Sequence, residues 1–360
     1  MRLRRITFDL TCHPGARHRR APNRFTQAET FEILRPFLQN NPRARAIFRA
    51  ARVAYRHSAA GRDFYAVEQR TEARNAAYLA AAVPLGAATI RRCLENASVS
   101  ASAVDYLVVV SCTGIDIPGL DLLLAGRLGM RSDLRRTCVL GMGCYAAFPG
   151  LLRAQEAVLA RPGTLALVLA LELCSLHLQP DDDSTENAIV SAIFGDGAAA
   201  VLIGDAGAPH SVATPGPARL IDTATHCDYT TLDHMAFHLT DHGFRMRLSA
   251  YVPELLAADV EGFVDDLLRR NHLRRSEVRF WGIHPGGARI LDHLQSCLGL
   301  RDEQMRFSRQ VLHDYGNMSS PTILFVLDEI QRSGQVEPGD FGVLLGFGPG
   351  LTMEGTLVQW

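Results

Sequence analysis

The stretch Val104-Asp-Tyr-Leu-Val-Val-Val-Ser111 gives the clearest indication of the fold. Its continuous run of β-branched and other apolar residues is typical of a strand that is buried on both faces of a sheet. A helical pattern follows it, and a short strand from Thr137 to Leu140 then leads through Gly141-Met-Gly-Cys144 into a second helix. This alternation predicts an α/β sheet that is covered by helices.

The last third of the chain repeats this plan. A strand from Val278 to Ile283 ends at His284, and a loop around Asn317 leads into a helix from Thr322 to Ile330. Ser111 lies 33 residues before Cys144, and His284 lies 33 residues before Asn317. Two segments with one plan indicate an internal duplication, and two stacked βαβ-rich halves predict a layered α/β core with the functional site at their seam.

The pattern of apolar and polar residues also predicts the remaining elements of the second half. They are a helix from Ile290 to Leu298, a strand-like segment from Arg306 to Arg309 and a strand from Gly342 to Gly346. The segment from Gly204 to Pro217 is rich in Gly, Ala and Pro, which predicts a boundary. We therefore expect an N-terminal half, residues 1–210, with the nucleophilic cysteine, and a C-terminal half, residues 211–360, with His284 and Asn317.

The composition is that of a soluble globular protein, since 47% of the 360 residues are hydrophobic and 21% are charged. The formal net charge of −1 creates no overall field that would attract nucleic acid or an anionic membrane. No apolar run approaches the roughly 20 residues of a membrane span, and the first residues lack the apolar core of a signal peptide. The eight cysteines include no C-x-x-C pair, so we expect a reducing cytoplasm and neither a disulfide framework nor a zinc finger.

Cys144 follows a Gly-Met-Gly turn and precedes an apolar helical pattern. The helix dipole and the free backbone amides at the start of a helix stabilise the thiolate form of a cysteine, and the thiolate is the nucleophilic form. The alternative is a buried structural cysteine, the commoner fate of free cysteine. The local sequence alone leaves both interpretations open.

His284 and Asn317 also have two interpretations each. His284 ends a buried strand before Pro285-Gly-Gly, where side chains point into a crevice, although it could be a satisfied core histidine. Asn317 stands in a loop, where its amide could simply cap the helix that begins near Ser320. Together with Cys144, however, the two supply a nucleophile, a proton acceptor and an oxyanion donor at matched positions of duplicated halves.

Six ordered motifs give the chain a resemblance to the chalcone synthase-like, or type III, polyketide synthases, including bacterial members. They are Ser111-Cys-Thr-Gly-Ile-Asp-Ile-Pro-Gly, Gly143-Cys-Tyr-Ala-Ala, Phe194-Gly-Asp-Gly-Ala-Ala-Ala, Gly282-Ile-His-Pro-Gly-Gly, Tyr315-Gly-Asn-Met-Ser-Ser-Pro and Gly346-Phe-Gly-Pro-Gly-Leu-Thr. The match covers most of the chain, in order, and is less clear over the first hundred residues.

This resemblance implies the family's thiolase fold, with a layered αβαβα core, and a cytoplasmic homodimer that needs no cofactor. It implies that an acyl-CoA starter is transferred to Cys144. Malonyl-CoA would then lose carbon dioxide beneath His284 and Asn317, and the resulting carbanion would attack the thioester. Repetition would give a chain that cyclises to an α-pyrone, a resorcinol or a naphthol.

Two other functions remain open from the sequence. A β-ketoacyl carrier-protein synthase III-like enzyme performs a single condensation with the same fold and the same three residue types. A catalytically silent dimer of this fold would act as a partner scaffold. The Phe194 motif and the C-terminal Gly-Phe-Gly-Pro-Gly favour the polyketide synthase, and the retention of all three catalytic residue types argues against the scaffold.

The resemblance also assigns residues of a substrate pocket. Phe194 matches a gatekeeper phenylalanine between a CoA tunnel and a cavity, and the second gatekeeper phenylalanine falls on Met246. Phe237 stands where plant enzymes have glycine, which should narrow the cavity. The remaining expected pocket residues are Cys112 and Cys174, which replace threonines of plant enzymes, with His177, Ser319 and Ile117; the residue that aligns with Ile117 crosses the dimer interface.

Two charged patterns complete the set of candidates. Arg45, Arg49 and Arg52 recur at i, i+4 and i+7, which predicts one basic helix face that either is merely solvated or binds CoA phosphates. Three histidines, at positions 234, 238 and 242, would suit a metal ion on a helix. The resemblance places them in strands and turns instead, so we expect no metal site.

Overall fold

One long sheet forms the centre of the molecule. The computed structural model describes residues 6–13, 23–179, 182–205 and 218–360. In spatial order the strands are β11 (Val278–Ile283), β12 (Phe341–Gly348), β13 (Thr352–Gln359), β8 (Ala218–Cys227), β1 (Ile6–His13), β7 (Asp196–Asp205), β6 (Ala166–Leu173), β4 (Tyr106–Val110) and β5 (Arg135–Val139). The two halves of this sheet meet where β1 pairs with β8.

The order of strand directions is the same in both halves. β4 is parallel to β6, and antiparallel pairs then join β6 to β7 and β7 to β1. In the second half β11 is parallel to β12, and antiparallel pairs join β12 to β13 and β13 to β8. This repeated order is the internal duplication that the sequence predicts.

Two helices lie between the halves of the sheet. α5 (Ala147–Ala160) contacts β4, β6 and β7 as well as β8 and β13, and α10 (Thr322–Arg332) contacts β11 and β12 as well as β1 and β7. Phe148 of α5 and Leu324 of α10 belong to one buried apolar cluster. The central layer therefore joins the two halves through a shared core.

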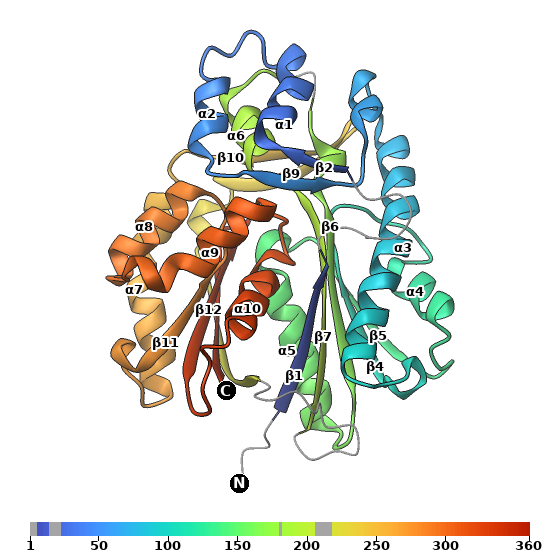
Figure 1. Ribbon diagram of the computed structural model, residues 1–360, viewed down its shortest axis with the longest axis vertical. Coiled ribbons are helices and arrows are strands. Elements are labelled where there is room, and N and C mark those ends of the chain that lie inside the picture. Colours follow the sequence, from blue (N-terminus) through green and yellow to red (C-terminus); the bar gives the residue numbers. More distant parts are fainter. Residues whose placement is uncertain (1–5, 14–22, 180–181, 206–217) are drawn as a thin grey trace.

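The other long helices cover the outer faces. α3 (Thr71–Asn96) and α4 (Leu120–Leu128) lie along one flank, and α7 (Val252–Arg270) and α8 (Ala288–Leu298) lie along the other, as Figure 1 shows. From one side of the molecule to the other, the layers are α3 and α4, the first half of the sheet, α5 and α10, the second half of the sheet, and α7 and α8. The expected layered α/β core is present.

One predicted element is wrong. Arg306 to Arg309, expected to be strand-like, lies inside α9 (Asp302–Tyr315). Four residues are too few to reveal a period, but over the whole segment the buried positions Met305, Ser308 and Leu312 recur at helical spacing. In chain order, α9 therefore stands between α8 and α10 in the second half, as β5 stands between α4 and α5 in the first.

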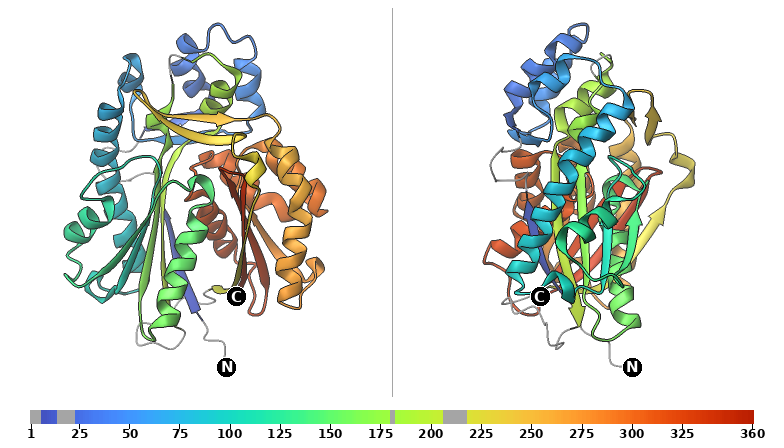
Figure 2. Two further views of the ribbon diagram at one scale, coloured as in Figure 1. Left: turned by 180° about the vertical axis from the view of Figure 1, so that it is seen from behind. Right: turned by 90° about the vertical axis from the view of Figure 1, so that its right-hand side faces the viewer.

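A cap covers the ends of the strands where His284 and Cys144 lie. It consists of α1 (Gln27–Leu34), α2 (Ala44–Ala50), α6 (Thr185–Ile193), the pair β2 (Asn23–Thr26) and β3 (Tyr55–Ser58), and the hairpin of β9 (Met235–Thr240) and β10 (Gly243–Leu248). The view from behind in Figure 2 shows these elements at the top, above the ends of the strands. The expected boundary from Gly204 to Pro217 falls largely on residues 206–217, outside the described residues.

Candidate functional site

Cys144 lies in a tight turn at the start of the central helix α5. The turn is possible because Gly143 has a φ of 69°, and a Cβ there would meet the ring of Pro349 at 2.8 Å. Cys144 is 3% exposed, and this burial raises the pKa of its thiol to about 11, although hydrogen bonds from Ser319 and Asn317 act to lower it. Burial therefore acts against the thiolate that the helix start was expected to favour, because loss of hydration opposes the amides of the helix.

His284 follows directly after β11 and is 1% exposed. Neither of its ring nitrogens has a hydrogen-bond partner within the described part of the chain. Burial lowers the pKa of the imidazole to about 3, so the ring is neutral at pH 7. A neutral ring with unpaired nitrogens can accept a proton from a thiol or donate a hydrogen bond to a ligand.

Asn317 stands in the turn between α9 and α10. Its Oδ1 accepts a hydrogen bond of 2.8 Å from the backbone N–H of Ser319, so the side chain stabilises the turn, but it does not cap α10, which begins at Thr322 without a side-chain cap. Its Nδ2 donates a long hydrogen bond of 3.4 Å to the carbonyl of Gly286, and the side chain also forms a hydrogen bond with the sulfur of Cys144. The turn thus fixes the amide through its oxygen and leaves the NH₂ group for the cavity.

These three residues line one cavity, of about 350 Å³, between the two halves. Cys144 comes from the first half, and His284 and Asn317 come from the second. The remaining walls are mostly apolar. They are formed by Ile193, Phe194, Met235, Met246, Leu248, Gly286, Ile290 and Phe347.

Two further spaces adjoin this cavity. On one side a pocket of about 510 Å³ shares Phe194 and Met246 with it. On the other side a more open space of about 870 Å³ shares Ile193, Leu248 and Ile290 with it and continues between α2 and α8. The three spaces form a series, in which Phe194 and Met246 separate the innermost pocket from the Cys144 cavity.

The inner pocket contains most of the residues that the sequence assigned to it. Phe194, Met246, Phe237, Cys112, Cys174 and His177 line its walls. His177 is held on both sides, since its Nε2 lies 2.7 Å from the carbonyl of Thr113 and its Nδ1 accepts from the N–H of Phe244. These contacts make His177 part of the pocket wall, with little freedom to transfer protons.

Two assigned residues lie elsewhere. Ser319 has a left-handed φ of 60° and is 1% exposed, and its hydroxyl lowers the pKa of both Cys144 and Cys112 from behind the cavity. Ile117 lies on the outer surface, 92% exposed, ahead of a cis peptide bond to Pro118. Neither residue lines the described pockets of this chain.

The sequence analysis missed a buried carboxyl group. Glu172 is fully buried at the end of β6, and it accepts hydrogen bonds from the Cys112 amide at 3.0 Å, from Thr113 Oγ1 at 2.7 Å and from Ser320 Oγ at 2.8 Å. Burial raises its pKa. An acidic residue that ends an otherwise apolar strand was the available signal, because such a group must be paired where it is buried.

The three candidate CoA-binding arginines have different environments. Arg45 packs 4.8 Å over the ring of Phe31, and Arg49 is exposed in the last turn of α2. Arg52 is not on their helix face, because α2 ends at Ala50 and Arg52 has a left-handed φ of 56°.

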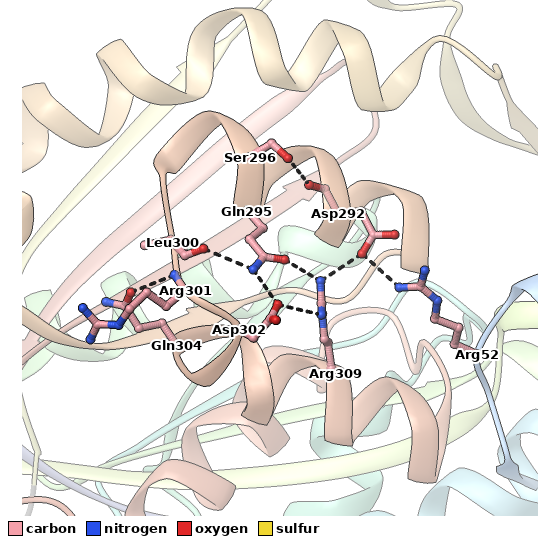
Figure 3. A network of polar contacts seen from close by, with 9 residues as sticks. All are labelled: Arg52, Asp292, Gln295, Ser296, Leu300, Arg301, Asp302, Gln304 and Arg309. Carbon is pink, nitrogen blue, oxygen red and sulfur yellow. Dashed lines mark hydrogen bonds and ion pairs between the residues drawn. The ribbon is translucent and has the colours of Figure 1, made fainter.

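Arg52 is instead part of a network between the cap and the second half. Figure 3 shows its guanidinium directed at Asp292 of α8, at 2.9 Å, while Asp292 also pairs with Arg309 of α9 at 2.9 Å. Gln295 and Asp302 extend the network. Arg52 thus connects two walls of the outer space, where α2 and α8 face each other.

No metal site or membrane helix is found where the structure is described. In the described ranges no group of three or more His, Cys, Asp or Glu side chains could hold a metal ion. His238 lies on β9 and His242 in the turn before β10, in strands and turns as expected. None of the helices within these ranges is long and apolar enough to cross a membrane.

Comparison with protein families gives two matches. Residues 64–207 match the N-terminal domain of chalcone and stilbene synthases, and residues 226–360 match the C-terminal domain. Among curated proteins, a 1,3,6,8-tetrahydroxynaphthalene synthase of Streptomyces peucetius subsp. caesius is 33% identical over 345 residues, which cover 94% of this chain and 90% of the relative. A 3,5-dihydroxyphenylacetyl-CoA synthase of Amycolatopsis balhimycina is 35% identical over 283 residues, covering 78% and 74%.

Solved structures agree with the sequence comparisons. PKS-I of the brown alga Ectocarpus siliculosus superposes with a TM-score of 0.90 at 30% identity, over 100% of both chains. The 1,3,6,8-tetrahydroxynaphthalene synthase of Streptomyces coelicolor A3(2), a bacterial type III polyketide synthase, has a TM-score of 0.88 at 29% identity over 99% of both chains. The similarity therefore extends over both halves and the cap.

Proposed function

The chain belongs to the chalcone and stilbene synthase family of type III polyketide synthases, and we propose that Cys144, His284 and Asn317 carry out its chemistry. In this proposal an acyl-CoA starter is loaded on Cys144 and extended by repeated decarboxylative condensation with malonyl-CoA. The observation that supports it most is the single cavity lined by these three residues, between an outer opening and an inner pocket.

Loading begins from a neutral pair. The thiol of Cys144 and the ring of His284 are both uncharged at pH 7. As Cys144 Sγ attacks the thioester carbonyl of the starter, a nitrogen of His284 takes the thiol proton. The carbon–sulfur bond to CoA then breaks, and the CoA thiolate recovers that proton. The acyl group remains on Cys144.

Extension uses the same residues in another role. The thioester oxygen of malonyl-CoA would accept hydrogen bonds from the Nδ2 of Asn317 and from an N–H of His284. These bonds stabilise the enolate that forms when the bond to the carboxylate breaks and carbon dioxide leaves. The carbanion attacks the acyl carbon on Cys144, the carbon–sulfur bond breaks, and the Cys144 thiolate leaves. The lengthened chain is then the thioester of the CoA that entered with malonyl, and its transfer to Cys144, with release of that CoA, begins the next round.

The inner pocket would hold the growing chain. Its walls bring apolar surfaces of Phe194, Phe237 and Met246 together with thiols of Cys112 and Cys174. A folded chain of alternating ketones needs such an enclosed space to cyclise without competing hydrolysis. The names of the two curated relatives, a tetrahydroxynaphthalene synthase and a dihydroxyphenylacetyl-CoA synthase, support an aromatic cyclised product.

The surroundings of this activity are also part of the proposal. We expect no cofactor besides the CoA substrates, because the residues of the cavity supply all the proton transfers and the oxyanion donors. A homodimer is supported by exposed apolar side chains, namely those of Ile115, Leu122 and Leu123, which are close to Ile117 in the sequence, and those of Leu140 and Met142. None of the seven cysteines in the described ranges forms a disulfide, which supports a cytoplasmic location.

The test is mass spectrometry of the enzyme with malonyl-CoA alone, and with acetyl-, hexanoyl- and long-chain acyl-CoA starters. We expect acylated Cys144 and a cyclised product for at least one mixture. Cys144→Ala should abolish both, and Cys297→Ala, two turns of α8 beyond the cavity-lining Ile290, should abolish neither. Normal product from Cys144→Ala would overturn the proposal. Product only with an acyl carrier protein would favour the single-condensation synthase.

A further inference from the structure

Arg56 is a buried arginine that no part of the proposed reaction uses. It lies on β3 of the cap and is 3% exposed. Its guanidinium donates hydrogen bonds to three backbone carbonyls and to the side-chain oxygen of Gln27. The carbonyl acceptors are those of Ser191 at 2.7 Å, Ala192 at 2.7 Å and Phe194 at 3.0 Å.

These carbonyls belong to the end of α6. The last carbonyls of a helix have no partners within the helix and carry the negative end of its dipole, so a buried cation there is well placed. Burial lowers the pKa of Arg56 only to about 10, with Asp196 acting in the opposite direction, so the group stays charged at pH 7. Arg56 therefore fixes the direction in which the chain leaves α6.

The chain leaves α6 directly into the Cys144 cavity. Phe194, the next residue, forms an isolated parallel bridge with Asn317. The backbone N–H of Asn317 donates to the carbonyl of Ile193 at 2.8 Å, and the N–H of Gly195 donates to the carbonyl of Asn317 at 2.9 Å. A Cβ on Gly195 would lie 2.8 Å from the carbonyl oxygen of Tyr315, so the bridge is also closely packed.

We infer that Arg56 is a positioning residue for malonyl-CoA decarboxylation. Arg56 fixes the end of α6 through its hydrogen bonds to the carbonyls there. The bridge from Phe194 then fixes the backbone of Asn317, and with it the position of the Asn317 amide in the cavity. Cys144 lies in the turn before α5, in the other half, and among these residues it contacts the side chain of Asn317. In the proposed reaction that side chain acts on the malonyl thioester, whereas His284 takes the proton during loading. Arg56 should thus affect the step that uses Asn317 more than the loading of Cys144.

Gln27 provides a second, milder way to disturb this arrangement. Its Nε2 donates to the carbonyls of Ala192 and Phe48, both at 2.9 Å, while its Oε1 accepts from Arg56. Replacing Gln27 removes one support of the guanidinium and one contact with α6, but it leaves Arg56 in place. The fold should tolerate this change better than the loss of a buried arginine.

The inference rests on the proposed function, and its test separates the two half-reactions. Single-turnover acylation of Cys144 is measured by intact mass with acetyl-CoA alone, and release of carbon dioxide is measured with malonyl-CoA alone. For Arg56→Lys we expect decarboxylation to fall about 10-fold or more, because a misplacement near 1 Å can cost about 100-fold, with loading within about 3-fold of wild type. Gln27→Ala should shift the same ratio by a smaller factor.

Arg74→Lys is the matched control. Arg74 is 1% exposed and also donates hydrogen bonds to backbone carbonyls, but these belong to Leu176 and Leu178, which lie outside α6. We expect this variant to lose stability and to keep the wild-type ratio of the two half-reactions. If Arg56→Lys and Gln27→Ala slow both half-reactions equally, the inference is wrong. A wild-type enzyme that neither loads nor decarboxylates would instead contradict the proposed function.

Discussion

Met246 lies directly opposite Phe237 in the antiparallel pair of β9 and β10, and both side chains line the inner pocket. Met246 also lines the Cys144 cavity, so this cross-strand pair forms part of the wall between the two spaces. Phe237 packs edge-on against Phe194, with ring centroids 6.4 Å apart. The hairpin and the end of α6 therefore share the boundary between the Cys144 cavity and the inner pocket.

Phe237→Ala should lengthen the product. Removing the ring enlarges the inner pocket, so we expect a shift toward chains with at least one more extension, at a stability cost of about 2 kcal/mol for a half-buried aromatic side chain. Liquid chromatography with mass spectrometry measures the product lengths. Leu239→Ala, at an exposed position two residues further along the same strand, should leave them unchanged. An unchanged product from Phe237→Ala would mean that another wall limits chain length.

Alkylation of Cys144 should become faster with pH and show no plateau at neutral pH. Only the thiolate reacts, and burial raises the pKa of this thiol to about 11, so the rate should increase about tenfold per unit between about pH 7 and about pH 10. Iodoacetamide labelling, followed by peptide mass spectrometry, measures it. Because the resting His284 is neutral, His284→Ala should give the same slope. A plateau below about pH 8 would show a thiolate–imidazolium pair in the resting enzyme.

Glu354 should make the protein less stable as pH rises. Burial on β13 raises the pKa of this carboxyl group from 4.5 to about 7, with Thr225 as its hydrogen-bond donor. The folded state keeps the proton that the unfolded state loses above pH 4.5, so this stabilisation is present below pH 4.5 and is lost as pH rises to about 7.

Glu354→Gln isolates this effect. Allowing for the partial hydration of the group, wild type should lose about 1–2 kcal/mol relative to the variant between about pH 5 and about pH 8. Urea unfolding of both proteins at the two pH values measures the difference. A difference that does not change with pH would mean that Glu354 ionises normally in the folded protein.

Ile117→Asp should separate the proposed dimer. A charge at a side chain that is 92% exposed in one chain costs little in the monomer but is unfavourable in an apolar interface. Light scattering coupled to gel filtration should show a dimer for wild type and for Val67→Asp, and a monomer for Ile117→Asp. A wild-type monomer would contradict the proposed assembly.

The arginines of α2 should contribute unequally to CoA binding. Arg45 and Arg49 form no ion pair within the described part of the chain, so replacing both with alanine should raise the KM for malonyl-CoA about 3- to 10-fold with little change in kcat. Arg52→Ala should mainly cost stability, below about 1 kcal/mol, since its pair with Asp292 is exposed. An unchanged KM after replacement of all three would reject a phosphate site here.

The sequence was sufficient to predict the family, the layered fold and the catalytic candidates, for a physical reason. Buried strands are continuous apolar runs, and the turns that end them need glycine and proline. The polar or reactive side chains of Ser111, Cys144, His284 and Asn317 are therefore easy to recognise among these residues. The comparisons confirm the family and the thiolase fold. The roles of the three catalytic residues and the division into halves at residue 210 stay predictions.

What the sequence did not predict depends on contacts between distant segments. Arg306 to Arg309 resembles a strand over four residues, and only the buried face of all of α9 shows the helical spacing. The pKa of Cys144 depends on how completely the second half covers the first, which outweighs the local helix start. The pairing of Arg52 with Asp292 joins residues 240 positions apart, which no local pattern indicates.

The shared wall of Phe194 and Met246 has a consequence for when synthesis stops. Each added unit occupies space in the inner pocket, and the only described space that adjoins it through this wall is the one into which the next malonyl group must enter. A chain that has filled the pocket obstructs the delivery of its own next unit. In the proposed reaction the enzyme would then need no separate mechanism to count the units, because the filled pocket itself would end growth.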